Sequence, residues 1–365
     1  MRADKLFCKI QKPYAPKAHR ISGGGGIKSK VLHNVFDEMI SLENLFLAWR
    51  EFRRGKRKKM DVQQFEFNLE DNLFQLHREL KNKTYQHSDY TAFCISDPKP
   101  RRIHKAIVRD RVLHHAIFRI LYPIFDKQFI FDAYSCRLDK GTHRAVLRLE
   151  SFCQKASQNN QRNIFALKCD VKKFFDSVDQ DILLNLIKKK IQGEDAIWLI
   201  EKIVESFGAL DKKGIPLGNV TSQLFANIYL NELDQFAKHK LKIKYYLRYC
   251  DDFVILGDSE DFLIKLLKPI SDFLEKHLKL RLHNDKIIIR KYRQGIDFLG
   301  YVVLPHHHVL RTKTKRRIFN KLKHKRKSLL YGTISEETFN QSLQSYLGIL
   351  KHCNGHKIAQ SIEMY

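Results

Sequence analysis

The chain has 365 residues, 43% of them hydrophobic, which is enough for one large domain or two to three ordinary ones. No apolar run approaches the ~18 residues that a membrane-spanning helix needs, so we expect no membrane partner. Lys and Arg number 67 against 40 Asp and Glu, and this formal net charge of +27 favours nucleic acid as the partner. The seven scattered cysteines include no CxxC pair, which favours reduced thiols over a zinc site.

The first predicted region is a basic lead-in over residues 1–34, with a glycine run at 22–26 that is either a natural loop or an artificial linker. Helical segments are predicted over 42–59, which ends in the basic cluster RRGKRKK, and over 65–80, which has a periodic apolar face. Short strands and turns precede a return of helical periodicity at 113–125.

A buried strand is predicted over 164–170, and a Gly/Pro loop opens an apolar-striped helix within 214–236. The elements expected next are a hairpin at 246–257, a helix at 260–278, a strand near 286–290 and a hairpin at 296–309. The last sixty residues are predicted to be helical, and ten of the seventeen positions from Arg311 to Lys327 are Lys or Arg. The histidines at 306–308 cannot all point one way on a strand, so a solvated turn is favoured over a metal site.

Two adjacent acids, Asp251 and Asp252, stand between two apolar runs in the stretch YLRYCDDFVILG. Successive side chains of a strand alternate faces, so both acids cannot lie on one solvated face. One interpretation is an ordinary hairpin tip, where aspartate is common, and the other is a metal site at that turn. Asp170 ends the buried strand and can join them in one antiparallel sheet. Three converging carboxylates repel one another, and two Mg²⁺ ions that also bind substrate phosphates would remove that repulsion.

Four ordered motifs, FALKCDVKKFFDSV, GIPLGNVTSQLFANIYL, YLRYCDDFVIL and FLGY, resemble the palm motifs of reverse transcriptases. DPKPRRIHKAIVRDRVLHHAI and FDAYSCRLDKGTHRAV resemble fingers segments of that family, so the resemblance covers roughly residues 35–355. It implies an α+β right-hand polymerase with fingers, a palm that contains an antiparallel sheet, and a helical thumb. The implied boundaries are 35–163 for the fingers with part of the palm, 164–303 for the catalytic palm and 304–365 for the thumb.

The loop between the two acidic motifs indicates which group of reverse transcriptases the chain resembles. Group II intron and retron enzymes have a QG…SP-type loop, whereas this chain reads LGNVTSQ at 217–223. That form resembles the error-prone reverse transcriptases of diversity-generating retroelements. The resemblance then implies cDNA synthesis that is mutagenic at template adenines, from the element's own repeat RNA, by a cytoplasmic protein of bacterial or phage origin. The hairpin has Cys250 where Ala is commoner, and its small size makes this departure minor.

The resemblance assigns catalysis to the three acids. Asp170 and Asp251 would bind two Mg²⁺ ions, for which Mn²⁺ could substitute, with the backbone carbonyl of Val171 as a further ligand and Asp252 assisting. A primer 3′-hydroxyl would attack the α-phosphate of a bound dNTP. Lys286 would protonate the pyrophosphate, and an ordinary surface lysine is the alternative.

Other residues would bind the nucleotide. Phe175, five positions after Asp170, would exclude a 2′-hydroxyl, with Phe174 as a competitor and an ordinary core position as the alternative. On the fingers, Arg102 and Arg109 would grip the triphosphate, because arginine suits bidentate phosphate binding. A solvated basic strand against the template backbone is the alternative for either arginine.

The LGNVTSQ loop would set fidelity. Gly218 would let the backbone approach the templating base pair, because it has no Cβ, and Leu217 and Gln223 would flank that contact. A looser fit there would penalise misshapen base pairs less and so lower discrimination.

The remaining predictions concern nucleic acid and partners. Phe298, Leu299, Gly300 and Tyr301 would hold the primer strand. The basic C-terminal helices would follow the phosphates of the RNA–cDNA duplex, and the cluster at 53–59 would bind RNA or a protein. The family implies template RNA and a small basic accessory protein, which can be oligomeric, as partners.

Two other functions stay open. A retron- or group II intron-like enzyme of ordinary fidelity is the first, and the LGNVTSQ loop argues against it. The second is a non-catalytic RNA-binding protein on a polymerase scaffold, against which the presence of all three acids argues.

Overall fold

The computed structural model describes residues 35–97, 99–208 and 211–363, so the predicted basic lead-in and its glycine run lie outside the described residues. The chain forms two compact units. Unit 1 comprises the described residues up to Asp139 together with Val171–Lys242 and Ile270–His283. Unit 2 comprises Lys140–Asp170, Ile243–Pro269 and the described residues from Asn284 onward. The units interleave along the chain, and the predicted boundaries of fingers, palm and thumb stay a prediction.

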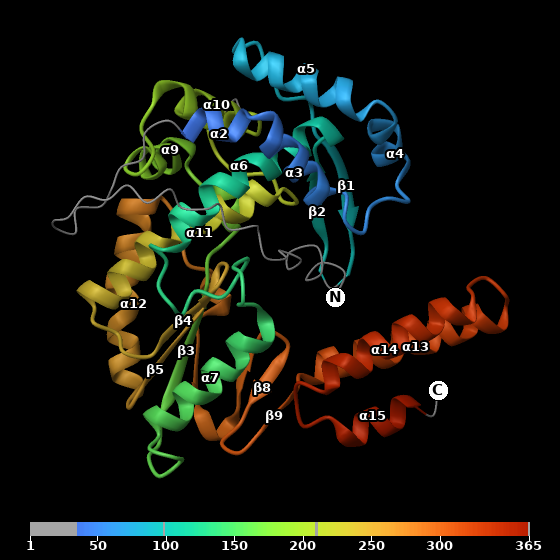
Figure 1. Ribbon diagram of the computed structural model, residues 1–365. Coiled ribbons are helices and arrows are strands. Elements are labelled where there is room, and N and C mark those ends of the chain that lie inside the picture. Colours follow the sequence, from blue (N-terminus) through green and yellow to red (C-terminus); the bar gives the residue numbers. More distant parts are fainter. Residues whose placement is uncertain (1–34, 98, 209–210, 364–365) are drawn as a thin grey trace, which may run out of the picture. The chain divides into compact units, whose positions relative to one another are not determined.

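Unit 1 is mainly helical (Figure 1). Its long helix α6 (Val108–Asp126) packs against α3 (Leu42–Phe52) and α11 (Val220–Gln235). α3 begins where the Ser41 hydroxyl accepts a hydrogen bond from the Asn44 backbone N–H, and it buries Leu45, Ala48, Trp49 and Phe52 at helical spacing. The other elements wholly in this unit are α2 (Val35–Ile40), α3 (Leu42–Phe52), α4 (Met60–Phe67), α5 (Leu69–Lys81), β1 (Thr91–Ile95), β2 (Arg101–Lys105), α8 (Phe174–Ser177), α9 (Gln180–Lys188), α10 (Glu194–Glu205), α11 (Val220–Gln235) and a π-helical turn (Phe236–Lys240).

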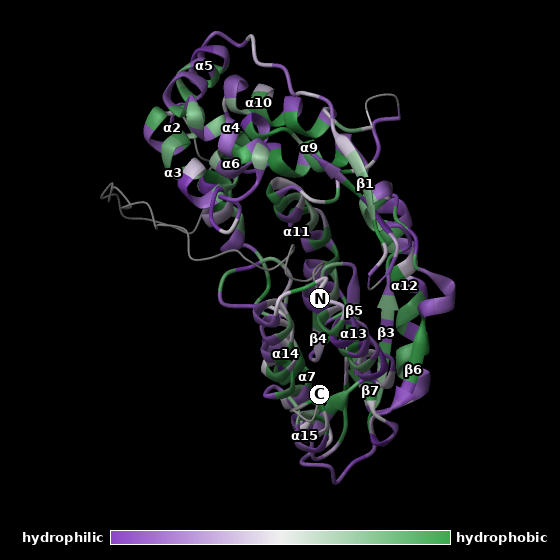
Figure 2. Cartoon of the chain, turned by 90° about the vertical axis from the view of Figure 1, so that its right-hand side faces the viewer, coloured by the Kyte–Doolittle hydropathy of each residue, from purple (hydrophilic) through white to green (hydrophobic). Residues whose placement is uncertain are grey.

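Two predicted helices differ in detail from the structure. The helix predicted over 65–80 is divided, because Asn68 leaves the helical backbone (φ −114°, ψ 45°) between α4 and α5. Asparagine competes with helical backbone bonds and therefore favours such breaks. The segment predicted over 42–59 is helical only up to Phe52, and its basic cluster follows in turns. The helices of unit 1 carry both hydrophilic and hydrophobic residues along their length, as amphipathic helices do (Figure 2).

Unit 2 contains two antiparallel sheets. The larger has the strand order β4-β5-β3-β6, and α7 packs on β4 and β5 (Figure 1). The smaller has the order β7-β8-β9, and basic helices follow it. The elements are α7 (Thr142–Ala156), β3 (Phe165–Asp170), β4 (Tyr246–Tyr249), β5 (Asp252–Gly257), a 3₁₀ turn (Asn284–Lys286), β6 (Ile288–Lys291), a 3₁₀ turn (Tyr292–Gln294), β7 (Ile296–Phe298), β8 (Tyr301–Val303), β9 (His308–Leu310), α13 (Thr312–Leu330), α14 (Glu336–Leu350) and α15 (His356–Glu363).

Helix α12 (Glu260–Leu278) contains Pro269, and the unit boundary falls directly after that residue. The predicted α+β class is confirmed, since the described strands form antiparallel sheets among many helices. In the described part of the chain, no helix is long and apolar enough to cross a bilayer.

Candidate active site

The three predicted catalytic acids lie at one end of the larger sheet of unit 2. Strand β3 ends at Asp170, and its antiparallel register with β5 places Asp170 directly opposite Asp252. Tyr249 pairs with Asp252 across the β4–β5 hairpin, so Cys250 and Asp251 form a two-residue loop beside them. Directly opposed residues of antiparallel strands have Cα atoms about 4.5–5.5 Å apart. The sheet thus brings the acids together, and their catalytic role stays a prediction.

The hairpin loop contains a backbone feature that the sequence analysis missed. Cys250 has φ +56°, in the left-handed region that residues other than glycine rarely adopt. Its carbonyl oxygen accepts a hydrogen bond of 3.1 Å from Nη1 of Arg248, a cation that is almost completely buried. Such strained positions cluster at functional sites, where the surrounding structure holds them in place. The backbone conformation of Cys250, as well as its small side chain, therefore shapes the hairpin loop that contains Asp251.

The acids are crowded and incompletely neutralised. Burial and the neighbouring Asp170 raise the pKa of Asp251 above its ordinary value. Burial raises the pKa of Asp252 to about 6, since Lys168, whose Nζ is 3.9 Å away, offsets this and the neighbouring acids only in part. Like charges held close together favour a bound cation or a retained proton.

The donor set fits a hard divalent cation. Carboxylate oxygens are the ligands that Mg²⁺ prefers, and it commonly uses one or two of them with water and substrate phosphates. Among the residues that the structure describes, no three or more His, Cys, Asp or Glu side chains are grouped so as to hold a metal ion by themselves. The residues therefore fit an ion that shares its coordination with a substrate, and not a closed structural site.

Lys286 lies beside the acids. It ends a 3₁₀ turn that leads into β6, and β6 pairs with β3, so the turn comes near the end of β3. Its Nζ atom is 2.6 Å from Oδ1 of Asp170. Lys286 thus pairs with an acid of the site while its side chain is 40% exposed, and both proton transfer and an ordinary surface lysine stay open. The predicted strand near 286–290 begins slightly later, at Ile288.

The LGNVTSQ stretch, which is predicted to set fidelity, lies against strand β2 within unit 1. The backbone N–H of His104 donates a hydrogen bond of 3.0 Å to the carbonyl oxygen of Leu217. Gly218 has φ +127°, and a Cβ there would lie 3.0 Å from Cγ2 of Ile103. The glycine is therefore required by its own backbone and by β2, whatever else approaches it. Gln223 is buried in α11.

The structure distinguishes the two adjacent phenylalanines. Phe174 is almost fully buried and contacts the Tyr229 ring edge-on, so it is a core residue. Phe175 is only partly buried, and its carbonyl oxygen accepts a hydrogen bond of 2.8 Å from the N–H of Ile215. Phe175 is thus the better placed to meet a ligand, and its role against a 2′-hydroxyl stays a prediction.

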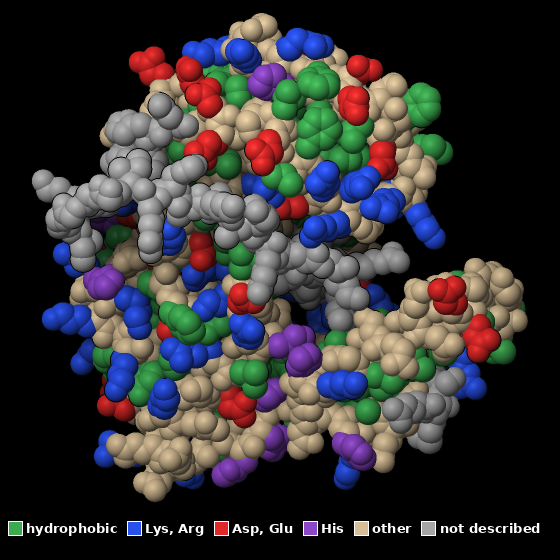
Figure 3. Space-filling view, in the orientation of Figure 1, with side chains coloured by type: hydrophobic (Ala, Val, Ile, Leu, Met, Phe, Trp, Pro, Cys, Tyr) green, Lys and Arg blue, Asp and Glu red, His purple; other side chains and the backbone are tan. Residues whose placement is uncertain are grey.

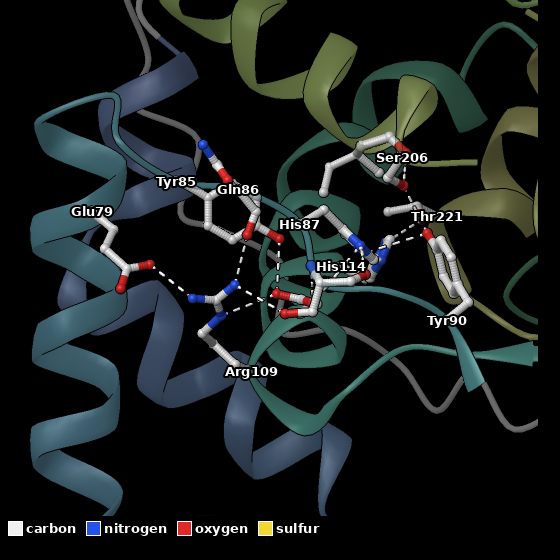
Figure 4. Close-up of polar contacts among 12 residues, drawn as sticks. Glu79, Tyr85, Gln86, His87, Tyr90, Arg109, His114, Ser206 and Thr221 are labelled. Atoms are coloured by element: carbon white, nitrogen blue, oxygen red, sulfur yellow. Dashed lines mark hydrogen bonds and ion pairs between the residues drawn. The ribbon is translucent and has the colours of Figure 1, made fainter. Parts of the chain in front are cut away.

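The two fingers arginines differ as well. Arg102 is exposed on β2. Arg109 donates hydrogen bonds to Glu79, Asp110, the carbonyl oxygen of Gln86 and the hydroxyl of Ser88 (Figure 4). Its guanidinium thus connects several segments of unit 1 through hydrogen bonds. Lys105 and Arg109 both line a pocket of about 630 Å³ in that unit.

A buried polar network that the sequence analysis missed continues from these groups. It contains His87, His114 and Thr221 (Figure 4). The only sequence signal was the adjacent pair of histidines in RDRVLHHA, since the partner residues come from distant segments. Thr221 belongs to the LGNVTSQ stretch, so the network reaches the predicted fidelity loop.

The FLGY segment forms a tight hairpin in unit 2. Phe298 ends β7 and Tyr301 begins β8, while Leu299 and Gly300 both have left-handed φ values of +51° and +89°. Positive φ at both loop residues is the pattern of a type I′ hairpin. The Tyr301 hydroxyl lies 3.2 Å from Nδ1 of His143. The predicted grip on a primer stays a prediction.

The histidine triplet is only partly the solvated turn that the sequence predicts. His306 and His307 are exposed, but His308 lies in β9, where its Nδ1 is 3.2 Å from Oε2 of Glu150. His352 stacks on His143 with ring centroids 3.7 Å apart. Figure 3 shows histidine side chains gathered on the face over α7, β8 and β9.

The predicted site residues therefore form separate groups. The acids, Lys286 and the FLGY hairpin belong to unit 2. The fidelity loop, the phenylalanines and the fingers arginines belong to unit 1, as does Val171, the residue after Asp170.

Comparison with known proteins identifies relatives over most of this region. Residues 96–303 match the family described as reverse transcriptase (RNA-dependent DNA polymerase). Protein YkfC of Escherichia coli (strain K12) is 25% identical over 245 residues, covering 56% of this chain and 64% of that protein. The group II intron-encoded protein LtrA of Lactococcus lactis subsp. cremoris is 23% identical over 305 residues, covering 64% of this chain and 49% of LtrA. This chain thus spans less than two thirds of the length of either relative.

Among solved structures, telomerase from Candida albicans in complex with a fragment of telomeric RNA is 12% identical. The match covers 78% of this chain and 58% of that one, with a TM-score of 0.48, a likeness too small to carry an argument. The family match spans more than half of the chain and includes the β3 acid, the LGNVTSQ loop, the acidic hairpin and FLGY. The chain belongs to the reverse transcriptase (RNA-dependent DNA polymerase) family.

Proposed function

We propose that this protein is an RNA-directed DNA polymerase that extends a primer with dNTPs along an RNA template. The observation that carries the proposal is the crowding of Asp170, Asp251 and Asp252 at one end of a sheet. Such crowding favours bound cations, and the +27 charge of the chain favours a polyanionic substrate. Nucleotidyl transfer onto a nucleic acid requires both properties.

The acids would hold divalent ions, two Mg²⁺ with Mn²⁺ as a substitute, through Asp170 and Asp251, with Asp252 and the backbone carbonyl of Val171 assisting. When bound, such ions stabilise the charge that develops on the phosphates during transfer. Lys286, whose ammonium touches Asp170, would hold a proton for the departing pyrophosphate.

Residues of unit 1 would select the nucleotide. Phe175, being partly exposed, would exclude a 2′-hydroxyl, and Arg102 would bind the triphosphate. Leu217, Gly218 and Gln223 would lie beside the base pair that forms between the template and the incoming nucleotide. Arg109 keeps its proposed role at the triphosphate only if it exchanges its four acceptors for phosphate oxygens.

In unit 2, the hairpin of Phe298, Leu299, Gly300 and Tyr301 would hold the primer. The basic helix α13 would follow the phosphates of the RNA–cDNA duplex. Template RNA and that duplex are therefore the proposed nucleic-acid partners.

We further propose that the enzyme belongs to a diversity-generating retroelement of bacterial or phage origin. Support comes from LGNVTSQ at 217–223, which resembles the loop of those error-prone enzymes. The proposal includes errors opposite template adenines, a template-repeat RNA and a small basic accessory protein as partners. The intron-encoded relative LtrA favours a second candidate, an intron-like reverse transcriptase of ordinary fidelity.

Primer extension tests both the polymerase proposal and the retroelement proposal. The wild-type chain is given a primed RNA template rich in adenines, Mg²⁺ and dNTPs, and the products are sequenced. The control is the double variant Asp251→Asn/Asp252→Asn, for which we expect a loss of at least about 10³-fold in rate, the scale of removing a preorganised charge. Errors concentrated opposite adenines support the retroelement proposal, and evenly spread rare errors support the intron-like one. Equal extension by both proteins contradicts the polymerase proposal.

A further inference from the structure

A chain of buried polar groups runs through unit 1 to the start of α11 (Figure 4). The hydroxyl Oγ1 of Thr221 is 2.6 Å from Nδ1 of His114. Nε2 of His114 is 3.1 Å from Nε2 of His87, and Nδ1 of His87 is 2.6 Å from the carbonyl oxygen of Ser88. Each contact is short enough for a hydrogen bond, so every ring nitrogen in the chain has a partner.

Both histidines are neutral at ordinary pH. His114 is almost completely buried, and its pKa lies well below the ordinary value, chiefly because burial disfavours the charged ring. Burial also lowers the pKa of His87, although the nearby Asp110 opposes that shift. A neutral imidazole has one N–H donor and one acceptor nitrogen. Each histidine in the chain must therefore donate through one nitrogen and accept through the other.

Nε2 of His87 has two neighbours, Nε2 of His114 at 3.1 Å and the Tyr90 hydroxyl at 3.3 Å, and the shorter contact leads to one arrangement of protons. The carbonyl oxygen of Ser88 can only accept, so His87 carries its proton on Nδ1 and its Nε2 is an acceptor. His114 must then donate from Nε2, which makes its Nδ1 an acceptor. Thr221 consequently donates its hydroxyl proton to His114, and its hydroxyl orientation is fixed by residues far away in the sequence.

The chain begins at a carboxylate that is itself fully engaged. Asp110 accepts hydrogen bonds from the Tyr85 hydroxyl, the Ser88 N–H and Nε of Arg109. The Ser88 N–H bond fixes the backbone that presents the Ser88 carbonyl to His87. Tyr90 is compatible with this arrangement. Ser206 is 2.7 Å from the Ile203 carbonyl oxygen and donates to it, so Tyr90 can donate to Ser206, 2.8 Å away, and leave Nε2 of His87 to His114.

The other end of the chain lies where the fidelity loop enters α11. The N-cap residue Asn219 makes no side-chain capping bond, and its buried Nδ2 has no hydrogen-bond partner in the described structure. The described hydrogen bonds that hold this entry are thus the His104 N–H to Leu217 carbonyl bond and the Thr221 to His114 bond. A loop without its cap depends strongly on such outside attachments.

We propose that Thr221, His114 and His87 are positioning residues that fix Leu217–Gln223, which comprise the turn before α11 and the first turn of that helix, so that nucleotide discrimination depends on the buried hydrogen-bond chain. None of the three needs to touch the substrate. The part that concerns discrimination rests on the polymerase function proposed above, whereas the part that concerns loop position does not.

The test compares Thr221→Val, which keeps the shape but removes the hydroxyl, with Thr221→Ser, which keeps the hydroxyl. Ile117→Val is the matched control, because Ile117 is fully buried on the same helix as His114 but is apolar. The first measurement is hydrogen exchange at the His104 amide and over 217–223. The second is kcat and KM for correct and incorrect dNTPs in primer extension.

We expect Thr221→Val to speed exchange at the His104 amide by about fivefold and to raise the incorrect-to-correct ratio of kcat/KM by a similar factor, the equivalent of about one hydrogen bond. The KM for the correct dNTP should account for most of the change. Thr221→Ser should restore both measurements, and Ile117→Val should lower the melting temperature without changing either.

Unchanged exchange and an unchanged ratio in Thr221→Val would overturn the proposal, as would equal effects from Ile117→Val. Faster exchange with an unchanged ratio would overturn the part that concerns discrimination. If the wild-type chain extends no primer, the polymerase function fails, and the exchange data still decide whether Thr221 positions the loop.

Discussion

Two clusters of charged side chains, one in each unit, differ in how completely their charges are paired. In unit 1, the buried Asp110 has three hydrogen-bond donors around it, and Arg109 has four acceptors. In unit 2, three acids meet with Lys168 and Lys286 as nearby cations, and the pKa values of Asp251 and Asp252 are raised. Full pairing marks a group that stabilises the fold, whereas residual crowding marks a place where the fold tolerates a cost for binding.

The largest difference in stability between the two regions is expected when one acid in each region is neutralised. Without divalent ions at pH 7, Asp110→Asn should lower the free energy of unfolding by about 3–5 kcal/mol, because its donors lose a buried charged partner. Asp252→Asn should leave that free energy unchanged or raise it. A carboxyl whose pKa rises on folding stabilises the protein below its ordinary pKa, and this stabilisation is lost as the pH rises through the folded value, here about 6.

Urea denaturation of both variants and the wild type, in the presence of a chelator, measures these differences. Equal losses from the two substitutions would contradict the contrast between the regions.

Adding Mg²⁺ tests the crowded acids without any catalysis. A ligand that binds only the folded state adds about 2.7 kcal/mol at one hundred times its dissociation constant, so Mg²⁺ should raise the melting temperature of the wild type. Asp251→Asn/Asp252→Asn should show no such rise. NaCl at equal ionic strength controls for general screening. A rise of the same size in the double variant would place the ion elsewhere.

Arg109 and Arg102 allow paired and exposed charges to be compared within unit 1. Arg109→Ala should lower the free energy of unfolding by about 2 kcal/mol, because charge-assisted hydrogen bonds are lost. Arg102→Ala, at an exposed position, should change it by less than about 0.5 kcal/mol. If Arg102 binds the triphosphate, its loss should raise the KM for dNTPs by roughly tenfold. Melting curves and steady-state kinetics on the same preparations separate the two effects.

The pH dependence of stability tests the buried histidines, and its effect is small near neutral pH. His114 has a lowered pKa in the folded state, so it binds a proton only on unfolding, and stability falls as the pH drops below about 6.5. His114→Gln removes this group. Between pH 6.5 and 5, the slope of the unfolding free energy against pH should therefore be smaller in the variant than in the wild type, by about 1.4 kcal/mol per pH unit. Parallel pH profiles for the wild type and the variant would show that another group titrates.

The acids could be found from the sequence because strand alternation and apolar runs set the register of a sheet. Once β3 and the hairpin are recognised, Asp170 and Asp252 can meet in one antiparallel sheet, and the register places them directly opposite each other. The family match over residues 96–303 spans these strands, and the catalytic role of the acids stays a prediction.

The hydrogen-bond network could not be found in this way. Arg109 and Arg102 belong to one basic run in the sequence, and only the positions of Glu79 and Asp110 tell them apart. His114 reaches Thr221 across more than a hundred positions, a contact that no local pattern predicts. The left-handed backbone of Cys250 was equally invisible, because cysteine gives no preference for it.

The order of strands in the larger sheet has a consequence for synthesis of the chain. β3, which ends in Asp170, is flanked by β5 and β6, both of which come much later in the sequence. During translation both edges of β3 stay unpaired until β5, which ends at Gly257, has emerged from the ribosome, and one edge stays unpaired until β6, which ends at Lys291, has followed. Such non-local pairing is slow and leaves strands open to aggregation. Folding of the sheet that carries the acids should therefore be late, and should depend on chaperones when the protein is made quickly.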